Sequence, residues 1–185
     1  THHVRLHVRS AFTWEPGTWI TEKESDMEDA IVSGVVGDDS EAKITITNVP
    51  DQPGVAAKVF RALASAGVNV DMIVQNVSEQ GETDISFTLP ADELSTVLPL
   101  TEQVANEIGA DSVTPDPSIA KVSLVGAGMK TNPGVAATVF ETLAANDINI
   151  EMISTSAIRI SVVVAGDQCD RAVSVLHSAF GLDVA

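Results

Sequence analysis

The chain has 185 residues, a formal net charge of −16 and 44% hydrophobic residues. Its length predicts one or two compact domains, and its mean hydropathy of +0.19 argues against disorder. An acidic chain repels phosphate backbones and anionic lipids, so neither a nucleic-acid nor a membrane partner is expected. Cys169 is the single cysteine, which excludes an internal disulfide. No signal peptide or transmembrane run is visible, and a cytoplasmic location is expected.

The first 30 residues differ in composition from the rest. They contain both tryptophans and three of the four histidines, namely His2, His3 and His7. We expect a short strand at Val4–Val8, a turn at Pro16-Gly17 and then a polar linker that includes Thr21–Asp29. The histidines suit either a metal site or an exposed strand. Because no Asp, Glu or Cys has a matching spacing, no metal site is predicted.

Alternating apolar residues predict strands in the first half of the chain. These strands lie at Ile31–Val36, Lys43–Val49, Val68–Val77, Thr83–Leu89 and Ala110–Thr114. One helix follows the loop Pro50–Gly54 and has an apolar face that includes Val59 and Leu63. A second helix spans Asp92–Ile108, with Pro99 near its start or at a kink. From the second strand on, the order is βαββαβ.

The second half of the chain repeats the first. Residues 53–73 and 133–153 share twelve of 21 positions at a constant offset of 80. A long repeat predicts two copies of one small unit. The later elements are predicted as strands at Lys121–Val125, Ile148–Thr155 and Ile158–Val164, and as helices at Val135–Asn146 and Gln168–Phe180.

The second copy has little sequence left for a fourth strand, because only Leu182–Ala185 remains. Either the chain is truncated, or a strand from elsewhere fills this place, and Ile31–Val36 is the spare one. The βαββαβ order predicts an α+β fold of two ferredoxin-like units, each an antiparallel sheet with helices on one face. Open sheet edges favour pairing with another copy, so a homodimer is expected.

The first candidate site is the repeated loop at Asp51–Gly54 and Thr131–Gly134. Pro suits the first helical turn, and Gly lets a ligand approach the backbone. The amides that follow, at Val55 and Ala56 and in their copies, are expected to be free to bind a carboxylate. Asp51 would then accept from an ammonium or hydroxyl group, so the loop suits a zwitterionic amino acid. The alternative is that Asp51 and its counterpart only cap helices.

The second candidate is the strand motif Asn69–Ile73 with its copy Asn149–Ile153. Alternation places the Asn and the Asp or Glu of this motif on one face of the strand. Polar residues inside a strand reduce β-propensity, so this face is expected to meet solvent, a ligand or a subunit. The methionines on the other face, Met72 and Met152, are expected in the core.

Motifs of common enzymes are missing. There is no Gly-rich loop ending in Gly-Lys-Ser/Thr and no Gly-x-Ser-x-Gly, and Gly126-Ala-Gly128 lacks the required lysine. His177 has no evident triad partner, and the few aromatic residues disfavour base stacking.

Several segments resemble the tandem ACT domains of aspartate kinase: Asp51–Gly54, Asn69–Asn76, Lys121–Lys130, Asn149–Ser156 and Ile158–Ser161. The start of the chain, with Val8–Phe12 and Gly17-Thr18, resembles the end of that family's kinase domain. Met27–Asp29 lies where the separate regulatory subunit of some relatives begins. The resemblance covers essentially the whole chain. It implies the end of a kinase domain and a linker at 1–30, a first ACT domain at 31–117 and a second at 118–185. The spare strand, at 31–37, is expected to pair with the second domain.

The resemblance also implies an allosteric function. ACT domains of this family bind threonine, lysine or both between ACT units, usually across a dimer, and inhibit the phosphorylation of aspartate, the first step toward lysine, threonine and methionine. The implied partners are therefore L-threonine or L-lysine, a second copy of the chain, and the catalytic domain or subunit. This chain alone is expected to be inactive and to hold no cofactor, because ATP and Mg would belong to the kinase domain.

The candidate effector-binding residues combine the two motifs with this resemblance. In the first copy they are Asp51, Pro53, Gly54, Val55, Ala56, Asn69, Gln75 and Asn76. In the second copy they are Asn132, Pro133, Gly134, Val135, Ala136, Asn149, Ile150, Ser154 and Ser156. By analogy, Asn149, Ile150 and Ser156 of one copy are expected to face five residues of another: Asp51, Gly54, Ala56, Gln75 and Asn76.

Two positions depart from the family pattern. Ala136 stands where relatives often carry Thr, and Ala157 stands where Glu is common. Both changes predict a weakened second-copy site. Two other functions remain open: a free-standing ACT sensor that acts on a different enzyme or regulator, and a ferredoxin-like catalytic domain, which phosphoryl transfer by this chain alone would establish.

Overall fold

The computed structural model describes residues 6–12, 16–20, 31–76, 81–127, 129 and 132–183. The residues from Ile31 onward form one compact unit, distinct from those before it. In the N-terminal stretch, β1 (Leu6–Val8) pairs antiparallel with β2 (Thr18–Ile20). Part of the strand predicted at Val4–Val8 and the whole polar stretch Thr21–Asp29 lie outside the described residues.

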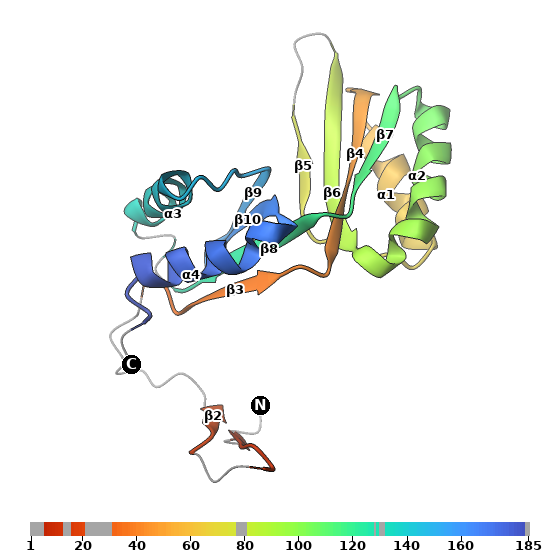
Figure 1. The fold of residues 1–185 in the computed structure, drawn as a ribbon. Helices are drawn as coiled ribbons and strands as arrows, with labels where there is room; N and C mark the ends of the chain where they lie inside the picture. Colours follow the sequence, from red (N-terminus) through yellow and green to blue (C-terminus); the bar gives the residue numbers. More distant parts are fainter. Residues whose placement is uncertain are drawn as a thin grey trace. The chain divides into compact units, whose positions relative to one another are not determined.

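The first repeat forms a four-stranded antiparallel sheet covered by two helices. Its elements are β4 (Glu41–Pro50), α1 (Val55–Ser65), β5 (Ile73–Gln75), β6 (Glu82–Pro90), the 3₁₀ turn η1 (Ala91–Glu93), α2 (Leu94–Ile108) and β7 (Ser112–Asp116). The strand order is β5-β6-β4-β7. Figure 1 shows α1 and α2 on the same face of this sheet. We call these elements the first unit.

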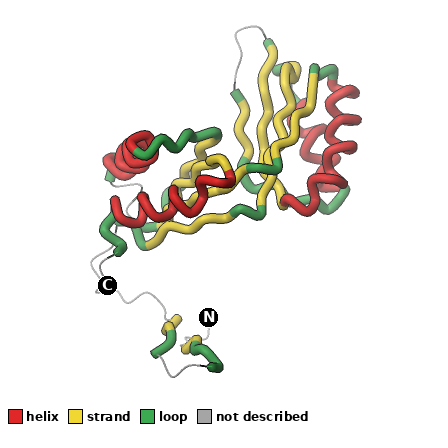
Figure 2. The backbone as a smooth tube through the Cα atoms, in the orientation of Figure 1, coloured by secondary structure: helices red, strands yellow, loops and turns green. Residues whose placement is uncertain are grey.

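The second repeat builds the same arrangement with one borrowed strand. Its elements are β8 (Ile119–Val125), α3 (Gly134–Ala145), β9 (Met152–Thr155), β10 (Arg159–Ala165), the 3₁₀ turn η2 (Gly166–Gln168), α4 (Cys169–Ala179) and, from before the first unit, β3 (Gly34–Asp38). The order is β3-β8-β10-β9, so β3 takes the place beside β8 that β7 takes beside β4. We call these elements the second unit (Figure 2). The predicted α+β fold with two antiparallel sheets is confirmed.

The apolar pattern of each unit explains its core. In the first unit, Ile44, Ile46 and Phe87 are completely buried between the sheet and the helices, where they pack with Val59 and Leu63 of α1. The second unit has a matching cluster built from β8, β10, α3 and α4. Because both helices cover the same face of each sheet, the opposite face is left for other contacts.

A β-bulge explains why strand β4 departs from strict alternation. Its pairing with β6 shifts register between Ile46 and Val49, and Asn48 adopts a left-handed backbone with φ of 52°. The extra residue lets both Ile46 and Val49 face the core.

The strand predicted at Val68–Val77 is much shorter in the structure. Only Ile73–Gln75 forms β5, although Asp71 and Met72 also exchange backbone hydrogen bonds with Thr88 of β6. This strand is the sheet edge, so one side of it has no pairing partner in the first unit. Helix α2 continues through Pro99 to Ile108. None of the described helices is long and apolar enough to cross a membrane.

The packing of the borrowed strand gives the first testable prediction. A Cβ at Gly37 of β3 would lie 2.7 Å from Cys169 Sγ and 3.0 Å from Val173 Cγ2 of α4. Gly37→Val should therefore push β3 off the helix and lower the free energy of unfolding by about 1–3 kcal/mol. Gly34→Val, in the same strand, is the control because nothing lies within 4 Å of its Cβ position. Equal midpoints of urea unfolding for the two variants would contradict this packing.

Candidate functional site

The loop between β4 and α1 is held by backbone hydrogen bonds. Asp51 N donates to Gly81 O at 2.8 Å, which ties the loop to the start of β6. The residue at the N-cap of α1 is Gly54, with a left-handed φ of 94° that favours glycine. No side chain makes a capping hydrogen bond there, so the alternative that Asp51 only caps this helix is not supported. Asp51 is exposed at the surface.

Of the two loop amides that were expected to be free in each copy, only the second lacks a backbone partner. Val55 N donates to Gln52 O at 3.2 Å, and the corresponding Val135 N donates to Asn132 O at 3.1 Å, so the expectation that these two amides are free was wrong. A tight turn just before each helix explains the difference. Among the described residues, Ala56 N and Ala136 N have no backbone acceptor. Each helix therefore still presents an amide donor at its positive end, where an anion is stabilised.

The sheet topology brings most first-copy candidates to one end. Both β4 and β5 run antiparallel to β6, so Asp51, after β4, lies at the same end of the sheet as Gln75 and Asn76. Pro53, Gly54, Val55 and Ala56 lie there too, at the start of α1. Asn69 begins the segment that leads into β5 and lies toward the other end, beside Val70 and Pro90.

The second copy divides in the same way. Pro133, Gly134, Val135 and Ala136 lie at the start of α3, with Asn132 just before them, while Thr131 lies outside the described residues. Ser154 and Ser156, in β9 and after it, lie at this end of the second sheet. Asn149 and Ile150 precede β9 and lie toward the far end. One copy alone therefore does not bring Asn149 or Ile150 to its own loop.

Ser156 has a structural role of its own. Its hydroxyl donates to Arg159 O at 3.3 Å and accepts from Ile158 N at 3.4 Å, and its amide donates to Arg159 O at 2.7 Å. These bonds close the turn between β9 and β10. Ala157, in this turn, is exposed.

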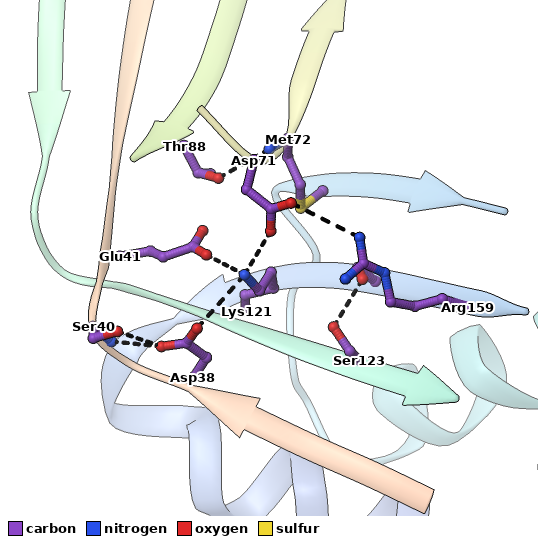
Figure 3. Close-up of polar contacts among 10 residues, drawn as sticks. Asp38, Ser40, Glu41, Asp71, Met72, Thr88, Lys121, Ser123 and Arg159 are labelled. Carbon is purple, nitrogen blue, oxygen red and sulfur yellow. Dashed lines mark hydrogen bonds and ion pairs between the residues drawn. The ribbon is translucent and has the colours of Figure 1, made fainter. Parts of the chain in front are cut away.

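The polar face of the Asn69–Ile73 motif meets the second unit of the same chain (Figure 3). Asp71 Oδ2 accepts from Lys121 Nζ at 2.6 Å, and Arg159 lies 3.8 Å from the same carboxylate. Lys121 also pairs with Glu41, and with Asp38 at 3.6 Å. The sequence left three possibilities for this face: solvent, a ligand or a subunit. The structure comes nearest to the third, but the contact is with the second unit of the same chain.

The second copy forms a matching contact with the first unit. Glu151, the counterpart of Asp71, pairs with Lys43 of the first unit, and Lys43 also lies 3.6 Å from Asp116. Lys43 and Lys121 occupy matching places, because each stands opposite an edge-strand Asp, in β7 and β3 respectively. Each unit thus offers a lysine and the acid before its methionine to the other, and the first unit adds Glu41. We call this region, with its ion pairs, the joint.

Apolar residues fill the middle of the joint. The matching residues Met72 and Met152 are buried together with Ile119 and Val163, and with the partly buried Val74. The methionines are buried as expected, but this cluster is separate from the cores of the two units. A hydrophobic patch flanked by ion pairs is a typical interface between domains.

The pKa values of Lys121 and Asp38 are shifted by their surroundings. Burial disfavours the ammonium, but the hydrogen bonds that it donates to Asp71 and Glu41 outweigh this effect and raise the pKa of Lys121 above its usual 10.5. The hydroxyl and amide of Ser40 donate to Asp38, which lowers the pKa of that carboxyl, and Lys121 adds to the effect. Glu41 Oε2 is buried and has no hydrogen-bond partner.

A hollow of about 300 Å³ lies beside this cluster. Its lining residues are Glu41, Asn69, Val70, Asp71, Leu89 and Pro90. Among the described residues, no group of three or more His, Cys, Asp or Glu could hold a metal ion. The joint was missed at the sequence level, although the signal was present: each unit's first strand contains a lysine, in Lys43-Ile-Thr and Lys121-Val-Ser.

The pKa shift of Lys121 predicts a pH dependence of stability. Because its folded pKa is raised, this lysine stabilises the fold fully below 10.5, and the contribution is lost as the pH rises through the folded value. Lys121→Met should lower the free energy of urea unfolding by roughly 3 kcal/mol near neutral pH, since it leaves the buried Glu41 carboxylate unpaired. The gap to wild type should shrink above pH 10.5.

The exposed Lys58 provides the control for this measurement, because none of its atoms forms an ion pair in the described structure. Lys58→Met should change stability little at any pH. A gap between wild type and Lys121→Met that stays constant across pH 10.5 would show that Lys121 does not titrate as its surroundings imply.

Comparison with known proteins agrees with this fold and geometry. The ACT domain family matches residues 44–100 and 122–180. The aspartokinase of Mycobacterium tuberculosis H37Rv is 51% identical over 98% of this chain, and the chain spans 44% of that relative's length. The solved regulatory subunit of aspartate kinase from Thermus thermophilus, in a ligand-free form, is 43% identical with a TM-score of 0.77, and covers 81% of this chain and 99% of its own.

A solved structure of aspartokinase alpha and beta subunits is also similar, with 44% identity and a TM-score of 0.76 over 80% of this chain and 98% of that one. The matched segments include both loops and both strand motifs, whereas Lys43 and Lys121 of the joint lie just outside them. The chain therefore belongs to the ACT domain family and carries the regulatory ACT region of aspartate kinases.

Proposed function

We propose that this region binds threonine or lysine and, through that binding, inhibits the phosphorylation of aspartate by a catalytic domain or subunit. The observation that carries the proposal is the repeated loop, in which the free Ala56 amide begins a helix and the exposed Asp51 precedes it. The amide suits the carboxylate of an amino acid, and Asp51 suits its ammonium group. The relatives are aspartate kinases, and the family resemblance implies that phosphorylation of aspartate is the first step toward threonine and lysine.

The geometry supports a site completed by a second copy of the chain. Within one chain, Asp51 and Gln75 share a sheet end, whereas Asn149 and Ile150 lie away from their own loop. These two groups would meet if the edge of one unit packed against another copy. The second-copy loop has Ala136 where relatives often carry Thr, so we propose that it binds more weakly.

Isothermal titration calorimetry tests this function directly. Threonine and lysine are titrated into the chain separately and then each in the presence of the other. Saturable heat from either amino acid supports the proposal, and cooperative heat from both would indicate two working sites. Absence of heat from both amino acids, alone and together, would refute it.

Asp51 is the most direct site variant. Asp51→Ala should weaken binding about tenfold or more, because a charge-assisted hydrogen bond to the ligand ammonium contributes about 1.5–3 kcal/mol. Asp92→Ala is the control, since Asp92 is exposed in η1, after the opposite end of β6. Gln75→Ala should weaken binding less, because a neutral hydrogen bond contributes about 1 kcal/mol. Unchanged affinity in both site variants would contradict the site assignment.

We also propose that the chain forms a homodimer through its sheet edges. Strands β5 and β9 are the matching edges, and each exposes an isoleucine: Ile73 is 50% exposed and Ile153 is 45% exposed. An unpaired edge with a large apolar side chain favours association with another strand. The two isoleucines occupy the same position of the repeat. A symmetric pairing of two chains would therefore bury the β5 and β9 edges together.

Charge at these edges tests the dimer. Ile73→Lys and Ile153→Lys together should lower the mass measured by sedimentation equilibrium from dimer toward monomer, because edge lysines oppose strand pairing. Thr96→Lys, at an exposed position of α2, is the control and should leave the mass unchanged. A dimer that survives both edge substitutions would place the interface elsewhere.

A further inference from the structure

The ion pairs on the two sides of the joint follow one plan. On both sides a lysine pairs with an acid of the other unit and lies 3.6 Å from an edge-strand Asp. On both sides that Asp accepts from the amide of a serine two residues later, Ser40 or Ser118. The carbonyls of these serines accept from the first residue of η1 and of η2, at 2.8 and 2.7 Å. The two halves of the joint are therefore built from the same parts.

Glu41 breaks this symmetry. It lies two residues before Lys43, and the residue two before Lys121 is Ile119, which packs in the methionine cluster. Glu41 instead pairs with Lys121 through one oxygen, while its other oxygen is buried without a partner. A buried carboxylate oxygen without a partner is costly, so a stable fold keeps such an atom only with a compensating reason.

The extra acid makes one contact of Lys121 replaceable. Three carboxylates, those of Asp38, Glu41 and Asp71, surround an ammonium whose side chain is only 11% exposed. Asp71 is 38% exposed and also has Arg159 nearby, so water and Arg159 can satisfy it if it leaves. Lys121 would keep Asp38 and could take up the free oxygen of Glu41. No buried ion would then be left unpaired, which is the usual penalty for breaking such a contact.

Asp71 is connected directly to the proposed effector site. It lies four residues before Gln75 on a segment whose backbone, among the described residues, pairs only with β6: Asp71 and Met72 bond to Thr88, and Ile73–Gln75 pair with residues 85–87. An edge segment with one neighbour can shift more easily than a central strand. A ligand that draws Gln75 toward the loop would therefore move Asp71 relative to Lys121.

We propose that the Asp71–Lys121 ion pair is a releasable contact that transmits ligand binding in the first unit to the second unit, and that Glu41 is the residue that makes it releasable. The proposal rests on the proposed function, because it needs a ligand at the first-unit loop. The mirror contact of Glu151 with Lys43 has no extra acid, so it holds the units together while the other side responds.

Methionine methyl groups report on the joint directly. Of the four methionines, Met72 and Met152 lie in it, one from each unit, while Met129 packs against the second-unit core near the second loop. The chain is labelled with methyl-¹³C methionine and titrated with the amino acid that calorimetry identifies. Wild type should show ligand-dependent shifts of both Met72 and Met152. A simultaneous shift of the Met129 signal would report ligand at the second loop. The Met72 and Met152 shifts are therefore compared at ligand concentrations too low to shift Met129.

Three variants separate transmission from stability. Asp71→Asn removes the charge of the releasable contact, and Glu41→Ile makes the joint symmetric by copying Ile119. Both should keep ligand binding and the Met72 shift but lose the Met152 shift. Glu41→Ile should also unfold at higher urea than wild type, because it removes an unpaired buried oxygen. The matched control Glu151→Gln should lower stability and keep the Met152 shift.

The outcomes distinguish this proposal from the proposed function. No binding heat in wild type would remove the effector and, with it, the transmission. Binding heat with a Met152 shift that persists in Asp71→Asn and Glu41→Ile would overturn the transmission alone. A Met152 shift lost equally in Glu151→Gln would overturn it as well, since the role would then be general support of the joint.

Discussion

The structure depends on one constraint: the second unit borrows strand β3 from the segment that precedes the first unit. Strand β3 pairs in the second sheet, and the next strand, β4, pairs in the first. The two residues between them, Asp39 and Ser40, must cross from one sheet to the other. Pro117 and Ser118 make the equivalent crossing from β7 to β8. Two short crossings close together hold the helix-free faces of both sheets in contact, and this contact is where the joint forms.

The joint explains why the repeat keeps an acid before each methionine. In a free-standing unit, Asp71 would be a solvated residue and Met72 an exposed apolar one. In the tandem arrangement, Met72 meets Met152, and each acid meets the other unit's lysine. The same strand then continues to the end of the sheet that carries the loop. One short segment, from Asp71 to Gln75, thus contacts the other unit at one end and reaches the proposed ligand site at the other. This arrangement suits a regulatory module.

Much of the architecture could be predicted because the repeat is long and its apolar periods are clear. The helices at 55–65 and 134–145 and the strands around Ile44, Phe87 and Val122 all follow from those periods. The extent of β5 could not be predicted, because Asn69 and Asp71 are extended yet largely lack ladder partners. The bound amide of Val55 depends on a turn closed by Gln52, which composition does not reveal. These differences arise from local hydrogen bonds.

The joint could not be predicted from periodicity, since it depends on tertiary distance. The pairing of Lys121 with Asp71 joins residues of different repeats, and an isolated lysine at the start of a strand is usually solvated. The methionines were placed in the core by pattern, yet only the fold shows that they form a separate cluster. Effector identity and the residues that touch it remain proposals that the loop chemistry supports.

The borrowed strand also affects the order in which the molecule can fold. Gly34 of β3 pairs with Val125 of β8, and the whole first unit lies between them in the chain. During synthesis the first unit can close its own sheet early, but β3 must wait with an unpaired edge until β8 has been made. Such non-local pairing is slow, and exposed strands are prone to mispair with neighbouring chains. Two of the five residues of β3 are glycines, Gly34 and Gly37, so only Val35 and Val36 can expose large apolar side chains during that wait.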